Sequence, residues 1–105
     1  MQLLFQDDPR ISEAIRRKII SQHGSEIECW DEVYDPAATI FAVSRHGYET
    51  LKSFAEAVDY ANSAYEGDDR LYQSDLIWIV DAAREHVYAT GIETRLKVTL
   101  ERAGV

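Results

Sequence analysis

Cysteine is almost absent from this sequence: Cys29 is the single one among 105 residues. One thiol forms no internal disulfide and has no second thiol with which to build a zinc site, which suits a reducing compartment. Long apolar runs are also missing, since none approaches the roughly 18 residues of a membrane span, and Met1–Phe5 is too short for a signal-peptide core. We therefore expect a cytoplasmic protein with no membrane partner.

Positive charge is scarce as well. The chain holds 11 Lys and Arg against 19 Asp and Glu, for a formal net charge of -8. A surface of this sign repels the phosphate backbone, which supplies most of the non-specific affinity for nucleic acid. The balance disfavours direct nucleic-acid binding, and the acidic excess is either ordinary solubility charge or a surface that meets a basic partner.

Motifs of known chemistry are lacking too. The sequence has no glycine-rich phosphate loop, no nucleophile elbow and no HExxH zinc motif. His23, His46 and His86 fall on separate predicted elements without metal-ligand spacing, and His86 beside Glu85 gives only a weak acid/base signal. We expect no cofactor, no metal and no enzyme activity.

What is present is the composition of one folded domain. Hydrophobic residues make up 46% of the chain and aromatic residues 10%. These fractions are ordinary for globular proteins, and the length is that of one domain with a shared core. The sequence therefore predicts a single compact domain over residues 1–105.

The first predicted element is a helix that begins at Asp8-Pro9, because Asp is a good N-cap and proline fits the first helical position. Ile11, Ile15 and Ile19 recur at helical spacing on its buried face. His23-Gly24 should end it.

Residues 25–34 then alternate with period two, which predicts a half-buried strand. Ile27, Cys29 and Val33 share one face of it. Asp35-Pro36 is a turn signal, and the β-prone run 39–44 follows, so we expect an antiparallel hairpin between 25–34 and 39–44.

Three helices complete the prediction. The second helix runs through 51–65 with Thr50 as N-cap, and the last runs from Ile92 to Ala103 after a turn at Gly91. Between them, 71–88 begins with the strand-like run 76–80 but keeps helical spacing, and its length favours a helix.

The predicted fold class is α+β: an N-terminal helix, an antiparallel β-hairpin, then three helices packed on one face of the small sheet. A two-stranded hairpin is marginal alone. The helices must cover one of its faces, or a third strand must come from residues 1–5 or from another subunit, which would make a homodimer.

The candidate site is the strand face opposite Ile27, where aromatic rings alternate with carboxylates and would face outward. Rings supply buried area on docking, while charges supply steering and register. The alternative is that a helix packs over these rings. The predicted partner-binding residues are Glu26, Glu28, Trp30, Glu32 and Tyr34. Glu66, Asp68 and Asp69, in the loop after the second predicted helix, extend this acidic surface.

The leading hypothesis is a small acidic module that inhibits or regulates a basic protein, including one that binds nucleic acid, by presenting carboxylates in place of phosphates. In size and charge alone it resembles acidic bacterial or phage inhibitors such as anti-CRISPR proteins and nuclease immunity proteins, with no shared motif. Two alternatives remain open: a structural or regulatory homo-oligomer joined through hairpin edges, and a small enzyme using His86 or His46 with a carboxylate.

Overall fold

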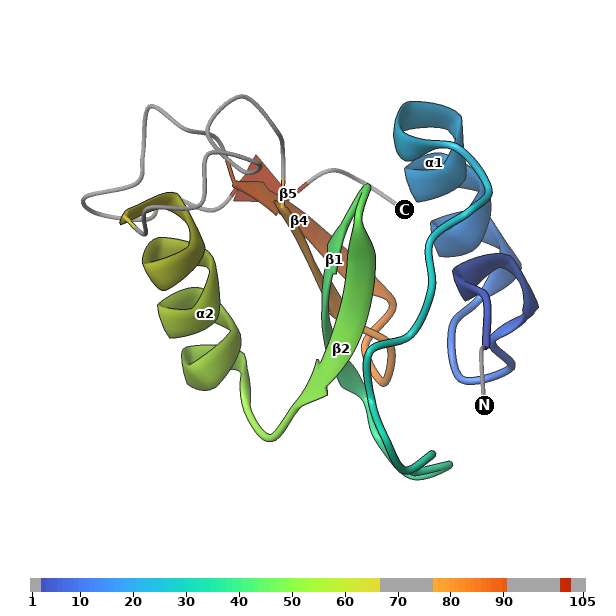
Figure 1. The fold of residues 1–105 in the computed structure, drawn as a ribbon, viewed down its shortest axis with the longest axis horizontal. Coiled ribbons are helices and arrows are strands. Elements are labelled where there is room, and N and C mark those ends of the chain that lie inside the picture. The colour runs from blue at the N-terminus through green and yellow to red at the C-terminus, as the bar shows by residue number, and fades with distance from the viewer. Residues whose placement is uncertain (1–2, 67–76, 91–100, 103–105) are drawn as a thin grey trace.

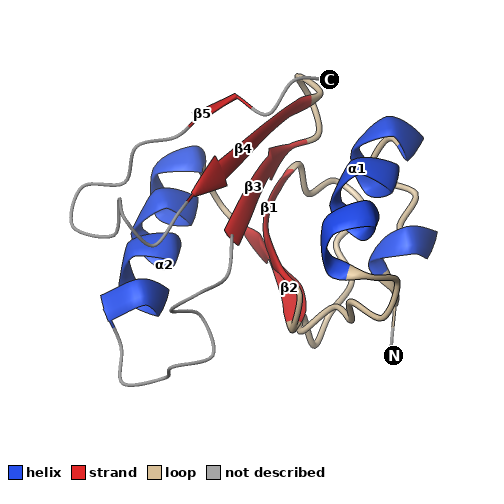
Figure 2. Cartoon of the chain, turned by 90° about the horizontal axis from the view of Figure 1, so that it is seen from above, coloured by secondary structure: helices blue, strands red, loops and turns tan. Residues whose placement is uncertain are grey.

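The computed structural model describes residues 3–66, 77–90 and 101–102. Over these residues the chain forms an antiparallel sheet with one helix on each of its faces (Figure 1). The view from above in Figure 2 shows the same three layers, with the sheet between the two helices. The elements are η1 (Phe5–Asp7), α1 (Glu13–His23), β1 (Ile40–Ser44), β2 (Gly47–Leu51), α2 (Phe54–Glu66), β3 (Ile77–Asp81), β4 (His86–Thr90) and β5 (Glu101–Arg102).

The strand order in the sheet is β2-β1-β3-β4-β5, and every neighbouring pair is antiparallel. β1 therefore lies between its hairpin partner β2 and the later strand β3. Val43 faces Tyr48 in the first pair, and Phe41 faces Val80 in the second. This register places β2 at one edge of the sheet.

Two apolar cores fill the spaces on either side of the sheet. All five residues of β1 and all five of β3 are buried, and their side chains alternate between the two cores. The core on the α1 side contains Phe5, Ile11, Ile15, Ile19, Ile27, Phe41, Val43, Tyr48, Trp78, Val80 and Val87. The core on the α2 side contains Ile40, Ala42, Ala57, Ala61, Ile77 and Ile79.

The first helix is confirmed at its end and corrected at its start. It ends at His23, where Gly24 takes a positive φ of 86° and donates its N–H to the carbonyl of Ile20. It begins at Glu13 rather than at Asp8-Pro9, because the Ser12 hydroxyl is the cap that accepts the Ile15 N–H.

The second helix is confirmed as α2, again with a different cap. Thr50 belongs to β2, and the Ser53 hydroxyl accepts the N–H of Glu56 in the first turn. The capping residue sits three positions later than expected because the chain first completes the β1–β2 hairpin.

The predicted strand over 25–34 is wrong, and so is its hairpin with 39–44. Residues 25–34 contribute only two isolated bridges, Leu4 with Glu28 and Cys29 with Tyr48. The actual hairpin joins Ile40–Ser44 to Gly47–Leu51 through a short turn. Its turn holds two residues, Arg45 and His46, against four in the predicted hairpin, so closing it costs slightly less conformational entropy.

The predicted helix over 71–88 is also wrong where the structure describes it, because 77–81 and 86–90 form the β3–β4 hairpin. Both faces of β3 are covered, so its apolar run lacks the alternation that marks a half-buried strand. The turn between the strands holds Glu85 at a positive φ of 54°.

The expected helix over 92–103 lies largely outside the described residues, except that Glu101–Arg102 form a strand. The arrangement of helices on one face is corrected as well, since α1 and α2 cover opposite faces (Figure 2). Among the described residues, no helix has the length and apolar character needed to cross a bilayer.

Candidate functional site

The segment 25–39, which links α1 to β1, is irregular but firmly attached at its start. Ile27 is fully buried in the core on the α1 side. Its carbonyl accepts the Phe5 N–H at 2.8 Å, and the Cys29 N–H donates to the carbonyl of Leu3 at 2.9 Å. The N-terminal residues and this segment therefore hold each other against the core.

The same segment runs along the outer edge of β2. The Tyr48 N–H donates to the carbonyl of Glu28 at 3.0 Å, and the Trp30 N–H donates to the carbonyl of Tyr48 at 2.8 Å. One residue further, the Asp31 carboxylate accepts the Thr50 N–H at 3.1 Å. These bonds occupy the outward N–H groups of Tyr48 and Thr50.

Beyond these anchors the segment exposes its large apolar side chains. Trp30 is 43% exposed, Val33 is 79% exposed and Tyr34 is 37% exposed. They are the large hydrophobic side chains that the described residues leave exposed, and in sequence they alternate with carboxylates. The exposed acids of this segment are Glu26, Glu28, Glu32 and Asp35.

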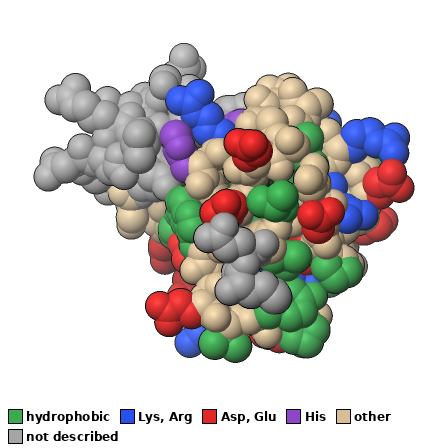
Figure 3. Space-filling model, turned by 45° about the vertical axis from the view of Figure 1, so that its right-hand side comes forward, with side chains coloured by type: hydrophobic (Ala, Val, Ile, Leu, Met, Phe, Trp, Pro, Cys, Tyr) green, Lys and Arg blue, Asp and Glu red, His purple; other side chains and the backbone are tan. Residues whose placement is uncertain are grey.

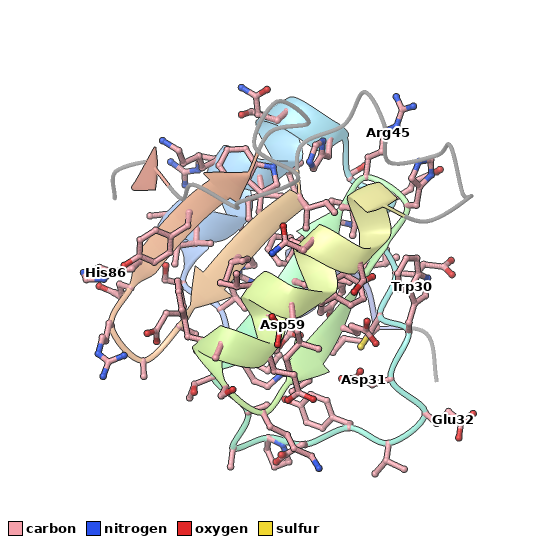
Figure 4. The ribbon with its side chains drawn as sticks, turned by 90° about the vertical axis from the view of Figure 1, so that its left-hand side faces the viewer. Trp30, Asp31, Glu32, Arg45, Asp59 and His86 are labelled. Atoms are coloured by element: carbon pink, nitrogen blue, oxygen red, sulfur yellow. The ribbon has the colours of Figure 1, made fainter. Side chains whose placement is uncertain are left out.

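Figure 4 shows where part of this segment lies. Trp30, Asp31 and Glu32 follow one another along one edge of the molecule, whereas His86 lies at the opposite edge (Figure 4). In the space-filling view, apolar side chains gather toward the bottom with acidic ones beside them (Figure 3). We call Trp30, Val33 and Tyr34, together with the exposed carboxylates of Glu26, Glu28, Glu32 and Asp35, the acidic aromatic patch.

The indole of Trp30 occupies the space above a glycine. A Cβ at Gly47 would come within 2.2 Å of the Trp30 ring, which real Cβ atoms do not tolerate. The ring thus rests against the β2 backbone, and this close approach requires glycine at position 47. This contact with the backbone limits the orientations that the exposed Trp30 ring can adopt.

A groove of about 550 Å³ lies between the segment and the end of β2. Its wall carries three carboxylates and one lysine, so a cationic group would be attracted into it. The lining residues are Asp31, Glu32, Val33, Asp35, Ala37, Ala38, Thr39, Thr50, Leu51 and Lys52.

Electrostatics near the β2 edge also favour a cation. Burial raises the pKa of Glu49, and the nearby carboxylates of Asp31 and Glu56 raise it further, while a hydrogen bond with Tyr60 opposes the shift. Burial likewise raises the pKa of the Cys29 thiol, which keeps it protonated and unsuited to act as a nucleophile. Two cationic groups lie in this region: Lys52 lines the groove, and the Arg10 guanidinium is paired with Asp8.

Beneath the patch lies a buried polar network. Asp8 is fully buried and accepts hydrogen bonds from the guanidinium of Arg10 at 2.7 Å and from the hydroxyl of Tyr48 at 2.8 Å. Burial alone would raise the pKa of Asp8, but these bonds outweigh it and hold the pKa below its usual value. Burial and the bond to Asp8 raise the pKa of Tyr48, and the same carboxylate raises that of Arg10.

The five predicted binding residues within 25–34 lie on an irregular segment rather than on one face of a strand. Glu26, Glu28, Trp30, Glu32 and Tyr34 are exposed. Val33, expected to be inside with Ile27, is instead the most exposed of the apolar residues. Glu66 is the last residue of α2, and Asp68 and Asp69 lie outside the described residues.

Sequence reasoning missed four residues that build the site: Arg10, Asp31, Asp35 and Gly47. Arg10 is not among the residues predicted for the buried face of the first helix, yet its side chain is 3% exposed. Asp31 and Gly47 act through contacts with residues 19 and 17 positions away in the chain. Such contacts leave no local pattern in the sequence. Of the four residues, Asp35 alone had a local signal, as part of the predicted turn.

The histidines lie in different parts of the structure. His23 accepts the indole N–H of Trp78 at 2.8 Å, His46 sits in the β1–β2 turn, and His86 lies 3.3 Å from the Tyr88 hydroxyl. Throughout the described ranges, no three His, Cys, Asp or Glu residues are grouped so as to hold a metal ion.

Comparison with known proteins adds no family to this geometry: the chain matches no protein-family model, no curated protein and no solved structure.

Proposed function

We propose that this protein is a small acidic binding module that inhibits or regulates a basic protein by docking on it through the acidic aromatic patch. The observation that carries the proposal is the exposure of Trp30, Val33 and Tyr34 among carboxylates on one anchored segment. Exposed aromatic rings are typical anchors of protein interfaces, and a scattered surface residue would not need such anchoring.

The charge of the patch specifies the chemistry of the partner. Its four exposed carboxylates and the acidic groove beside them complement lysine and arginine side chains. Burial is the main cause of the raised pKa of Glu49, and a partner cation near it would relieve the repulsion from Asp31 and Glu56 that adds to this shift. A protein whose own ligand is nucleic acid carries a basic surface of this kind.

Attachment to the fold supports rapid and specific docking. Hydrogen bonds fix residues 28–31 along β2, and Trp30 rests on Gly47. A segment that is already ordered loses less conformational entropy on binding than a free loop. The patch therefore has the rigidity that a small inhibitor needs.

The first experiment captures partners from host lysate, purifies each captured basic protein and measures its binding by calorimetry. We expect 1:1 binding that Trp30→Ala weakens by about 2 kcal/mol or more, as for an interface anchor. Glu32→Lys should slow association roughly tenfold or more at low salt.

Glu85→Lys is the matched control, because it makes the same change of charge at an exposed site beside His86, at the opposite edge (Figure 4). It should bind as the wild type does. Equal binding by wild type, Trp30→Ala and Glu32→Lys would remove the acidic aromatic patch as the docking surface. A concentration-dependent mass lost in Trp30→Ala would instead show that the patch joins two copies of this chain.

A further inference from the structure

Arg10 has an unusual position for an arginine, since its side chain is 3% exposed. Its Nε donates to one oxygen of Asp8 at 2.9 Å, and its Nη2 donates to the other at 2.7 Å. This paired geometry is the strongest that an arginine and a carboxylate form. The guanidinium is thereby fixed in direction as well as in place.

The remaining donor of the same guanidinium reaches the acidic aromatic patch. Nη1 donates to the backbone carbonyl of Asp35 at 2.9 Å and lies 3.4 Å from the hydroxyl oxygen of Thr50. One side chain thus joins η1, β2 and the exposed segment.

Two aromatic rings also contact the guanidinium. Its central carbon lies 4.6 Å from the ring centre of Tyr34 and 4.7 Å from that of Phe41. Phe41 is fully buried in β1, whereas Tyr34 belongs to the patch. Cation–π attraction of this kind is stronger where water is excluded. Arg10 therefore lies between the core and a docking residue.

Other hydrogen bonds stop short of this part of the segment, although Ala38 at its end packs against the core on the α1 side. The hydrogen bonds made by Trp30 and Asp31 reach β2 before residue 32, and the carbonyl of Thr39 accepts the Ala82 N–H after residue 38. Among the hydrogen bonds of the described residues, the bond from Arg10 to Asp35 is the one that ties 32–38 to the rest of the chain.

We propose that Arg10 is the positioning residue of the acidic aromatic patch, holding Tyr34 and Asp35 in the arrangement that a basic partner meets. This inference rests on the proposed docking function. Arg10 acts through the segment and makes no contact with the partner itself. The ordering of 32–38 is thus completed in the free protein rather than on binding.

The test compares Arg10→Lys with wild type by backbone ¹⁵N relaxation of the free protein. Lysine keeps the charge but cannot make the paired bonds, the bond to Asp35 and the contacts with both rings together. We expect the amide order parameters of 32–35, Ala37 and Ala38 to fall from about 0.85 to below about 0.6, while those of 28–31 stay unchanged.

Tyr48→Phe is the matched control, because it removes a hydrogen bond to Asp8 from the same network without touching 32–38. It should lower stability and leave the order parameters of 32–38 as in wild type. Unchanged order parameters in Arg10→Lys, or an equal fall in Tyr48→Phe, would overturn the positioning role.

Tyr34→Leu provides a second measurement if Arg10→Lys does not fold. It removes the outer ring from the guanidinium and leaves the Asp8 pair and the core in place. A smaller fall in the order parameters of 32–38 is expected, and no fall would contradict the inference.

Binding of the purified basic partner separates this inference from the docking proposal. Arg10→Lys should weaken it about tenfold, because the segment must then be ordered on association. If the order parameters fall and the affinity stays at the wild-type value, Arg10 anchors the segment but the patch is not where the partner binds.

Discussion

Asp8 carries its charge in the interior of the protein, where an unpaired carboxylate would be very costly. Arg10 and Tyr48 donate to its two oxygens, so the charge is compensated by hydrogen bonds from the turn before α1 and from β2. Removing one member of a buried pair leaves the other charge without a partner, which costs about 3–5 kcal/mol. The network is therefore a sensitive point in the stability of the fold.

Asp8→Asn should lower the free energy of unfolding at pH 7 by about 3–5 kcal/mol, measured by urea denaturation. Its exposed neighbour provides the control, since Asp7→Asn should change stability by less than about 0.5 kcal/mol. A loss of similar size in both variants would contradict the role of the buried network.

The difference between wild type and Asp8→Asn should also depend on pH. The pKa of Asp8 is lower in the folded protein than its unfolded value of about 3.9. Its charge therefore stabilises the fold fully above that value, and this contribution is lost as the pH falls through the folded pKa. Urea titrations at pH 7, 4 and 3 should show the difference shrinking, and a constant difference would be inconsistent with an ionised Asp8.

At the scale of the elements, sequence patterns identified α1, α2 and the strand over 39–44, but took 71–88 for a helix and misplaced the other strands. Helical spacing identified α1 and α2 because each buries one face only. β3 was taken for a helix because both of its faces are covered, so its apolar run shows no alternation. β2 was missed because its burial is mixed, with two buried residues followed by three half-buried ones, so it shows no alternation.

The sequence predicted which residues of the candidate site are exposed, but not the contacts that position them. Alternation along 25–34 correctly indicated that Trp30 and Tyr34 are exposed, although these residues form no strand. Arg10 and Gly47, which hold the rings in place, act across long separations in the chain. Contacts of that kind are set by tertiary packing, which local periodicity does not encode.

Substitutions in the two apolar stretches should separate a central strand from an exposed loop. Ile79 is fully buried in β3, so Ile79→Ala should cost about 2–5 kcal/mol of unfolding free energy. Val33→Ala removes carbon from an exposed side chain and should change stability by less than about 0.5 kcal/mol. Thermal and urea unfolding would measure both, and a large loss in Val33→Ala would mean that its side chain is packed.

At the scale of the whole molecule, the net charge of -8 acts on every encounter. It slows approach to phosphate polymers and to acidic proteins, and it speeds approach to basic ones. The same charge that makes a basic partner attractive should prevent the protein from binding the nucleic acid that such a partner binds.

We therefore expect no binding to duplex DNA. Fluorescence polarisation of a labelled duplex in low salt should stay constant up to about 10 µM protein, well within the range where non-specific binders respond. Saturable, salt-sensitive binding in that range would overturn the exclusion of nucleic acid.

The bond from the Thr50 N–H to the Asp31 carboxylate has a consequence for association. β2 is an edge strand, and an uncovered edge invites a strand of another chain to add to the sheet, by aggregation or by domain swapping. Residues 28–30 and the side chain of Asp31 occupy that edge as a neighbouring strand would. The backbone of β2 is therefore not available for pairing with a strand of another protein, which must bind at this edge through side-chain contacts.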